Sequence, residues 1–326
     1  MRNRLSMEFL RKAVPWATSI VVLWLAVCAI AGVMSVNWAL HPPRLPIAPG
    51  AESEAAAIAA SDHATLEDAS IVADDGAVLR AWYIHPSPGN GDAVILLHGL
   101  ADNRAGTLGP AYLLLRHGYS VLLPDARAHG ASGGAIATYG VEEAGDIRDW
   151  FNWLNEKQAP HCIDGLGDSM GAAQILESLK AENHFCAVVA ESPFASFREA
   201  SYDRIGQWLG AEPRTGLVLA RTIFRPVITF GFIYARLRYG VNLERDDPAA
   251  AMATSNVSVL LIHGRLDDNL PPRHSEMILA RCHGRDSRNI ALWEPPDAGH
   301  IGASSAEPQE YERIVIGWLQ SHQSRR

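Results

Sequence analysis

The chain begins with a long segment that contains no charged residue. Residues 13–40 are apolar or weakly polar throughout and exceed the roughly 20 residues that a helix needs to cross a bilayer core. Trp16 and Trp38 lie near the two ends, where aromatic side chains favour membrane interfaces. The pattern predicts a transmembrane helix. The alternatives are a buried helix of the following domain and a cleaved signal peptide, whose apolar core is shorter, about 7–15 residues.

The charges that flank this segment predict its orientation. Residues 1–12 contain four basic residues and one acid, whereas only Arg44 follows the segment closely. Because Lys and Arg are retained on the cytoplasmic side, we expect a cytoplasmic N-terminus and an exported domain, periplasmic or extracellular. Residues 41–65 are rich in Pro and Ala and show no strand pattern, so they are predicted to be a tether.

After the predicted tether, short apolar runs alternate with helical patterns. Residues 69–73 and 78–84 predict a hairpin joined by an Asp-Asp-Gly turn. Later apolar runs are typical of buried parallel strands, and the segments between them predict helices. The runs are 93–97, 120–123, 163–166, 187–190, 257–262 and 290–292, and the main helices are 111–117, 141–158 and 309–320. The predicted fold class is α/β, a doubly wound and mostly parallel sheet within one domain, 66–326.

Composition narrows the function. The chain has 326 residues and a formal net charge of −8, which argues against a nucleic-acid partner because phosphate binding needs a basic surface. The four cysteines do not have the spacing of a zinc site. We therefore expect neither a metal nor another cofactor.

One motif carries candidate chemistry. Residues 167–171, Gly-Asp-Ser-Met-Gly, match G-x-S-x-G, a strand-to-helix turn that exposes a nucleophilic serine, here Ser169. Asp267 follows the predicted strand 257–262, and His300 follows the last predicted strand, so the three occur in the order Ser, Asp, His that accompanies this turn. The backbone N–H groups of Leu100 and Met170 are candidate donors to an oxyanion.

Neighbouring polar residues have simpler interpretations. Asp268 is an alternative to Asp267 as the acid, although the spacing to the preceding His-Gly and the following Pro favours Asp267. His98 and His263 are expected to orient loops. Asp125 and His129 are expected to lie in a surface loop after residue 124. Asp168 is expected to be a solvated carboxylate of the turn.

From about residue 66 to the C-terminus, the chain resembles the α/β-hydrolase superfamily. The resemblance rests on the His-Gly after residue 97, PDARAHGASGG (124–134), the serine turn, AESPFAS (190–196), HGRLDDNLP (263–271) and AGH (298–300). Ala128 replaces a glycine that the family usually has, which we expect to change only a turn. The chain is similar to membrane-anchored serine hydrolases and to esterase-like and prolyl-peptidase-like relatives.

The resemblance implies a serine hydrolase that cleaves a carboxylic ester or thioester of a small molecule, including a lipid. A peptidase or amidase with the same three residues, and a non-catalytic anchored binding module, remain alternatives. In this fold Cys162 and Cys186 precede neighbouring strands, so they form either a disulfide or two small buried side chains.

The family also places a helical lid in the gap between two strands, here at about residues 193–250. Residues 213–240 contain five arginines and no acid, with aromatic and aliphatic residues between them. One interpretation is a lid whose arginine stems extend outward from its core. The other is a basic, aromatic face that rests on anionic lipid headgroups and admits acyl chains. Pro226 is expected to kink any helix here.

Overall fold

The computed structural model describes residues 2–282 and 289–323. The chain forms two compact units. The smaller comprises Met1–Ala39 and Ser201–Leu243, and the larger comprises Leu40–Ala200 and Glu244–Arg326. The predicted single domain, 66–326, therefore has most of its predicted lid in a separate unit.

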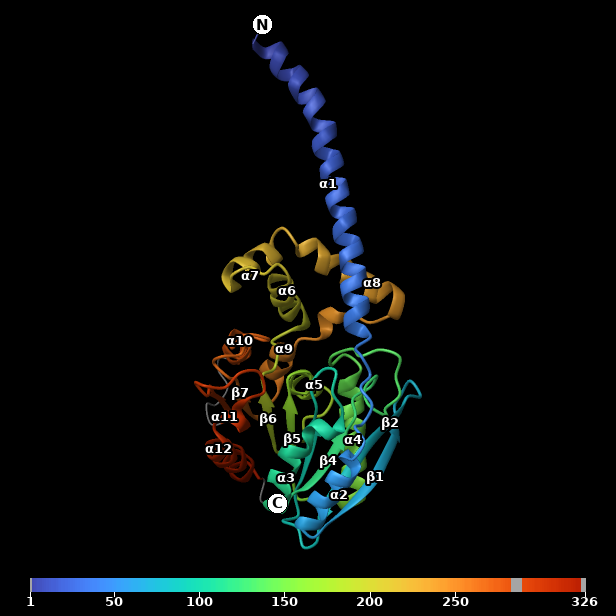
Figure 1. The fold of residues 1–326 in the computed structure, drawn as a ribbon, viewed down its shortest axis with the longest axis vertical. Coiled ribbons are helices and arrows are strands. Elements are labelled where there is room, and N and C mark those ends of the chain that lie inside the picture. Colours follow the sequence, from blue (N-terminus) through green and yellow to red (C-terminus); the bar gives the residue numbers. More distant parts are fainter. Residues whose placement is uncertain (1, 283–288, 324–326) are drawn as a thin grey trace. The chain divides into compact units, whose positions relative to one another are not determined.

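The larger unit is built on one eight-stranded sheet with the strand order β1-β2-β4-β3-β5-β6-β7-β8 (Figure 1). The hairpin strands β1 and β2 are antiparallel, β2 is antiparallel to β4, and the remaining neighbours are parallel. The strands are β1 (Ala64–Val72), β2 (Val78–Pro86), β3 (Ala93–Leu97), β4 (Ser120–Pro124), β5 (Ile163–Asp168), β6 (Ala187–Glu191), β7 (Ser258–Ile262) and β8 (Ile290–Trp293). The predicted doubly wound sheet is confirmed.

Helices cover both faces of this sheet, which explains why its central strands are apolar without alternation. Every residue of β3 is buried: Ile95 and Leu97 pack with Trp150 on one face, while Val94 and Leu96 pack on the other. The helices of the first face are α4 (Glu143–Gln158), α5 (Met170–Ser178), α9 (Pro248–Thr254) and α10 (Arg273–Arg281). Those of the second are α2 (Ala51–Ser61), α3 (Leu108–Arg116), α11 (Ala303–Ala306) and α12 (Pro308–Ser321).

Residues 41–65, predicted to be a tether, are in part a packed helix. Residues 51–61 form α2, which buries Ala51, Ala55 and Ala59 in the core on the second face of the sheet. Alanine has the highest helix propensity, and its spacing of four places these side chains on one face. Upstream, the Arg44 guanidinium donates 2.9 Å hydrogen bonds to two carbonyls of the loop after β4. Arg44 and α2 are therefore parts of the folded unit.

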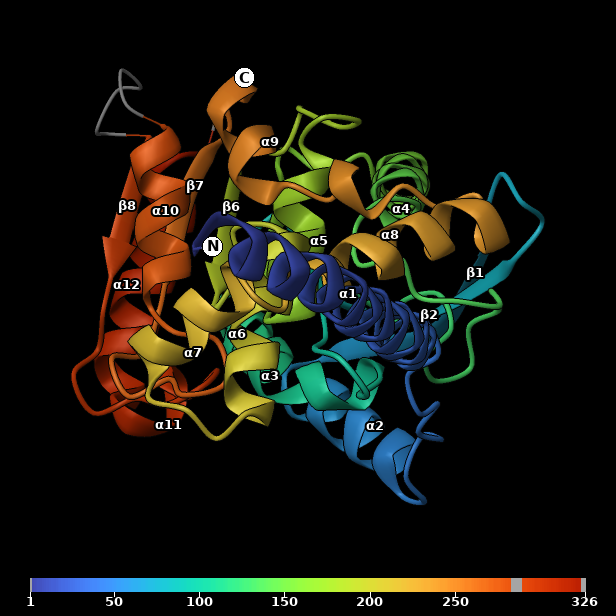
Figure 2. The ribbon, with the colours of Figure 1, turned by 90° about the horizontal axis from the view of Figure 1, so that it is seen from above.

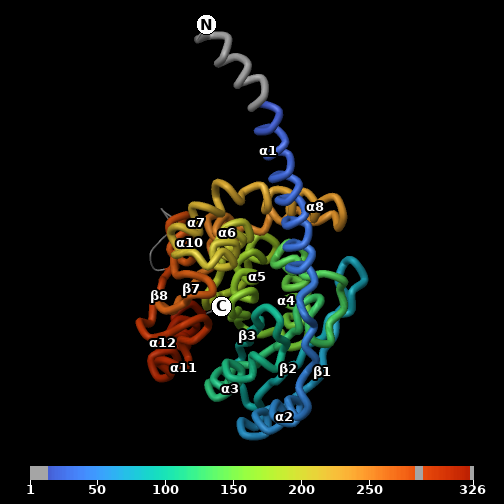
Figure 3. Tube along the Cα trace, turned by 45° about the horizontal axis from the view of Figure 1, so that its top comes forward, coloured from blue at the N-terminus to red at the C-terminus, as the bar shows by residue number. Residues whose placement is uncertain are grey.

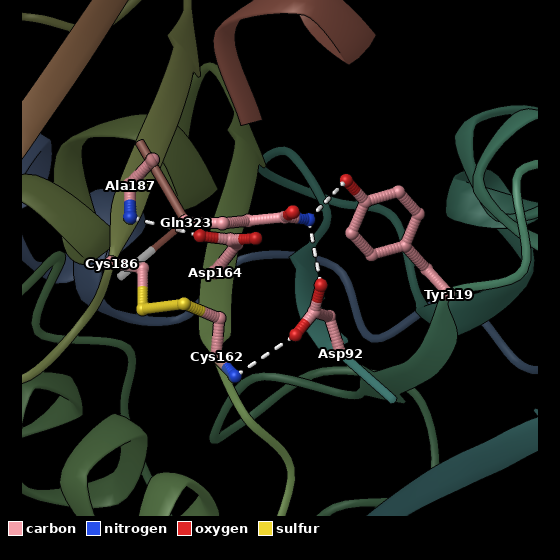
Figure 4. The surroundings of a disulfide bond; sticks show 7 residues. All are labelled: Asp92, Tyr119, Cys162, Asp164, Cys186, Ala187 and Gln323. Carbon is pink, nitrogen blue, oxygen red and sulfur yellow. Dashed lines mark hydrogen bonds between the residues drawn. A yellow bond between two sulfur atoms is a disulfide. The ribbon is translucent and has the colours of Figure 1, made fainter. Parts of the chain in front are cut away.

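A disulfide joins the amino ends of two central strands. Cys162 precedes β5 and Cys186 precedes β6, and their Cα atoms lie 5.8 Å apart, within the usual range for a disulfide (Figure 4). The Asp92 carboxylate accepts from the Cys162 N–H at 3.0 Å and from the Gln323 side chain at 2.6 Å. Of the two alternatives for these cysteines, the structure has the disulfide.

In the smaller unit, all the regular secondary structure of the described residues is helical. Its helices are α1 (Arg2–Leu40), the end of α6 (Phe197–Trp208), α7 (Pro213–Arg221) and α8 (Arg225–Tyr239). Residues Val14–Leu40 are long and apolar enough to cross a membrane, and α7 and α8 satisfy the same criterion as a pair bent by 59°. Pro226 lies in the first turn of α8, where a missing N–H costs little, so it begins a helix instead of kinking one.

Candidate active site

Ser169 occupies the sharp turn between β5 and α5. Its φ is +53°, a conformation that a side chain adopts only when the surroundings enforce it. The flanking glycines show what enforces it. A Cβ at Gly167 would lie 2.5 Å from the carbonyl carbon of Gly171, and one at Gly171 would lie 2.6 Å from the carbonyl carbon of Leu97. The backbones of β5, α5 and β3 are thus in direct contact here, which requires glycines on both sides of the serine.

The structure brings the three predicted residues into one hydrogen-bonded series. Ser169 Oγ lies 2.8 Å from His300 Nε2, and His300 Nδ1 lies 2.7 Å from Asp267 Oδ2. The residues come from the carboxyl ends of β5, β8 and β7. Because the ionised carboxylate only accepts, Nδ1 carries the proton and Nε2 accepts from the serine hydroxyl. A hydroxyl, an imidazole and a carboxylate in series suit nucleophilic attack by serine.

Asp267 is buried and well supplied with donors. Its Oδ1 accepts from the N–H groups of Asn269 at 3.0 Å and Leu270 at 2.9 Å, and His263 Nε2 lies 3.3 Å from Oδ2. Burial pushes the pKa of Asp267 upward, but hydrogen bonds from His263 and His300 outweigh it, so the pKa lies well below its usual range. The alternative acid, Asp268, has an exposed side chain.

The two predicted oxyanion donors flank this series. Met170 is the first residue of α5, where a helix leaves its N–H groups unpaired. Leu100 follows Gly99, at which a Cβ would lie 3.7 Å from the Cβ of Ser169. Within the described residues, neither N–H donates a hydrogen bond to another group of the chain.

His98 has the loop-orienting contacts that the sequence predicts. It is buried, and its Nδ1 donates to the Gly99 carbonyl at 2.7 Å while Nε2 accepts from Ala126 N–H at 3.0 Å. These bonds join the loops after β3 and β4. Burial, with the nearby His129, lowers the pKa of His98 to about 4, which keeps its ring neutral.

Asp125 and His129 are not on the surface, as we predicted from sequence, but are buried. The Asp125 carboxylate accepts from the backbone N–H of Arg104 at 2.7 Å and pairs with the guanidinium of the same residue at 2.9 Å. The loop after β4 therefore folds back onto the domain. Ala128 in this loop has a φ of +60°, which explains why the family usually has glycine there.

We did not predict a role for Glu191, the last residue of β6. Its backbone carbonyl accepts from the Ser169 N–H at 2.8 Å, and its side-chain Oε1 accepts from the Ala303 N–H at 2.9 Å. The adjacent Ser192 Oγ accepts from Ile301 N–H at 3.3 Å. The end of β6 thus holds both the turn that carries Ser169 and the loop that follows His300. The available signal was an acid that directly follows the apolar run 187–190.

A second acid lies beside Glu191. Asp168 on β5 is its register partner, and burial raises the pKa of Asp168 to about 7, with further upward pressure from Asp102. Burial, together with the Asp168 charge, raises the pKa of Glu191 to about 8. Near neutral pH, Glu191 therefore holds a proton, and Asp168 is not the ordinary solvated carboxylate that we predicted.

Comparisons with known proteins agree with this architecture. The sequence model of a protein family described as "Alpha/beta hydrolase family" matches residues 94–314. The uncharacterised protein YqkD of Bacillus subtilis is 30% identical over 241 residues, 72% of each chain, and the uncharacterised Rv2307c of Mycobacterium tuberculosis is 30% identical over 236 residues, again 72% of each.

Two groups of solved structures share the fold. The esterase Pf2001 of Pyrococcus furiosus superposes with a TM-score of 0.67 at 23% identity, covering 87% of this chain and 98% of its own. The acylaminoacyl peptidase of Pyrococcus horikoshii gives 0.60 at 14% identity, covering 81% of this chain and 42% of its own.

Proposed function

The chain belongs to the alpha/beta hydrolase family, and from that premise we propose that it is a serine hydrolase that cleaves a carboxylic ester or thioester through an acyl-enzyme. The observation that carries the proposal is the series Ser169–His300–Asp267, with contacts of 2.8 and 2.7 Å between consecutive groups. The site needs no group beyond these side chains and the two backbone donors.

Each residue has a defined part in this mechanism. Ser169 Oγ attacks the acyl carbon while His300 Nε2 takes its proton and later returns it to the leaving group; Asp267 keeps the ring in the required tautomer. The N–H groups of Leu100 and Met170 stabilise the tetrahedral oxyanion, at about 2.7–4 kcal/mol per donor in comparable sites. Water, activated by the same imidazole, then hydrolyses the acyl-enzyme.

A peptidase or amidase is the second candidate, favoured by the structural likeness to an acylaminoacyl peptidase. It would use the same groups. A non-catalytic binding module would not need the complete series, so covalent labelling separates it from both enzymes.

We further propose that α1 anchors the protein in a membrane and that the larger unit is exported. The apolar span Val14–Leu40 supports the anchor. The excess of basic residues before the span and the Cys162–Cys186 disulfide support export, because disulfides persist in oxidising compartments. Labelling of Val72→Cys, an exposed site in β1, by a membrane-impermeant maleimide on intact cells tests this orientation; protection until the cells are lysed contradicts it.

The enzymatic proposal is tested with a fluorophosphonate probe and a substrate panel. The full chain is offered p-nitrophenyl esters of graded acyl length beside aminoacyl amides. Ser169→Ala should abolish both labelling and turnover, whereas the control Ser70→Ala, an exposed serine of β1, should change neither. Undiminished turnover by Ser169→Ala refutes the mechanism, and faster cleavage of the amides selects the peptidase.

A further inference from the structure

Helix α8 crosses α1 (Figures 2 and 3), and the two helices meet at a pair of glycines. A Cβ at Gly32 of α1 would collide with the Val227 carbonyl oxygen, and a Cβ at Gly231 of α8 would lie 2.9 Å from the Gly32 carbonyl oxygen. The two backbones are therefore in contact. Small residues at such a crossing are what helices use to associate within a bilayer, where burial of apolar side chains gives no driving force.

Further contacts extend this crossing along α1. The rings of Trp24 and Phe224 meet edge to face at 5.3 Å between centroids, and the Tyr239 hydroxyl donates to the Asn37 side chain at 2.6 Å. Residues 24–37 lie inside the candidate span Val14–Leu40, and they cover about 20 Å at 1.5 Å per residue. If α1 spans the membrane, α8 is held at the depth of its C-terminal half.

The surface of residues 201–243 is unusually apolar. This segment exposes six large hydrophobic side chains, nearly as many as the seven exposed by the described residues of the larger unit, which is more than five times as long. The six are Trp208, Leu209, Val218, Ile223, Ile233 and Leu237. Leu237 on α8 is 82% exposed.

Exposed cations are interleaved with these apolar side chains. The segment 213–240 contains five arginines, all with exposed side chains, and no acid. They are Arg214, Arg221, Arg225, Arg236 and Arg238. Exposed apolar side chains mixed with exposed cations are typical of helices that lie in a membrane interface and bind anionic headgroups.

We propose that α7 and α8 insert into the leaflet nearest the C-terminal end of α1, packed on α1 through Gly32 and Gly231, with their arginines at anionic phospholipid headgroups. This inference rests on the membrane anchor proposed above and goes beyond it. The protein then meets the bilayer through a helical surface as well as a single span, and its partner is the lipid itself.

Lipid-quenching measurements on the full chain test this insertion. The chain, with Cys28 and Cys282 replaced by alanine, is reconstituted into vesicles of zwitterionic and anionic phospholipid that carry bromine on their acyl chains. An environment-sensitive fluorophore is attached at Leu237→Cys in α8. Ile20 of α1 is 65% exposed, and a label at Ile20→Cys reports on the anchor. Val72 of β1 is 67% exposed, and a label at Val72→Cys is the control outside α1 and α8.

Insertion predicts that the labels at 237 and 20 are quenched by brominated lipid while the label at 72 is quenched only by aqueous iodide. If the label at 20 is quenched and that at 237 behaves like that at 72, the insertion is refuted and the anchor stands. If none of the three is quenched by lipid, both proposals fail. A label at 237 shielded from lipid and from iodide is covered by this chain or by a second copy of it, which also refutes insertion.

A second pair of variants tests the role of the glycine crossing. Gly32→Leu places a side chain against the Val227 carbonyl, whereas Ala26→Leu adds the same side chain at an exposed position of α1. We expect Gly32→Leu to reduce lipid quenching at 237 at least twofold and Ala26→Leu to leave it unchanged. Equal quenching in both variants shows that the crossing does not hold α8 in the leaflet.

Discussion

Replacement of Glu191 tests whether this buried carboxyl at the end of β6 acts in its protonated form. The Glu191 side chain is 3% exposed and accepts the Ala303 N–H, while its backbone holds the Ser169 N–H. Glutamine has the shape of the protonated acid and keeps the acceptor oxygen. Glu191→Gln should therefore preserve both contacts and remove only the charge that would form at high pH.

The structure sets the sign and size of the effect on stability. Burial, with the charge of Asp168, raises the pKa of Glu191 from 4.5 to about 8. The folded state therefore binds more protons than the unfolded state, and the free energy of unfolding falls as pH rises from 4.5 to about 8. At about 1.4 kcal/mol per pKa unit, the full loss is on the order of 5 kcal/mol. Glu191→Gln should remove this slope, and the variant should match the wild type at pH 4.5 and exceed it at pH 9.

Glu191→Leu tests the positioning role separately. It leaves the buried Ala303 N–H without an acceptor, at about 1–3 kcal/mol. Because the same loop carries His300, we expect kcat to fall about tenfold with little change in KM, while Glu191→Gln retains the wild-type kcat near neutral pH.

The assays are thermal unfolding of the full chain in detergent between pH 4.5 and 9, and turnover of a short-chain ester. Glu156→Gln, an exposed glutamate of α4, is the matched control and should alter neither. The reasoning is refuted if Glu191→Gln unfolds with the same pH slope as the wild type, or if it loses as much activity as Glu191→Leu.

Three further results are expected. Asp267→Asn should lower kcat by about 10³–10⁴-fold because the imidazole loses its tautomer control, and a fall below tenfold in steady-state ester hydrolysis contradicts the assignment. Reduction of Cys162–Cys186, which closes a sequence separation of 24, should lower the unfolding free energy by about 3 kcal/mol; thiol titration of denatured protein should find two free thiols before reduction and four after it. Arg221→Gln with Arg225→Gln should slow long-chain ester hydrolysis on anionic vesicles about fivefold per arginine at low salt, at about 1 kcal/mol each, and an unchanged chain-length profile argues against a role for these arginines at the membrane.

The sheet and the hydrogen-bonded series of Ser169, His300 and Asp267 could be predicted because each depends on local patterns. Short apolar runs identify buried parallel strands, and strand ends place the residues that follow them at one edge. The Gly-x-Ser-x-Gly turn adds a steric requirement that few other structures share. The positions of Ser169, Asp267 and His300, each after the carboxyl end of a strand, could therefore be predicted from the sequence.

Other features depend on what the chain folds against, and local patterns do not record that. Residues 51–61 resemble a linker in composition, yet their alanines fit a closely packed face. Asp125 looks like a surface residue until the Arg104 guanidinium is placed beside it. The partner of Glu191 lies 112 positions away at Ala303. Such contacts follow from the tertiary fold and not from periodicity.

The glycines around Ser169 have a consequence for directed evolution of this protein. A Cβ at Gly167 or Gly171 would meet backbone atoms, which do not yield as the end of a flexible side chain does. In a saturation library at positions 167 and 171, active variants should carry almost exclusively glycine at both. Diversity that changes substrate scope should instead accumulate at exposed residues near Ser169. Leu100 is one of them, because it is 38% exposed and contributes its backbone and not its side chain to the proposed chemistry.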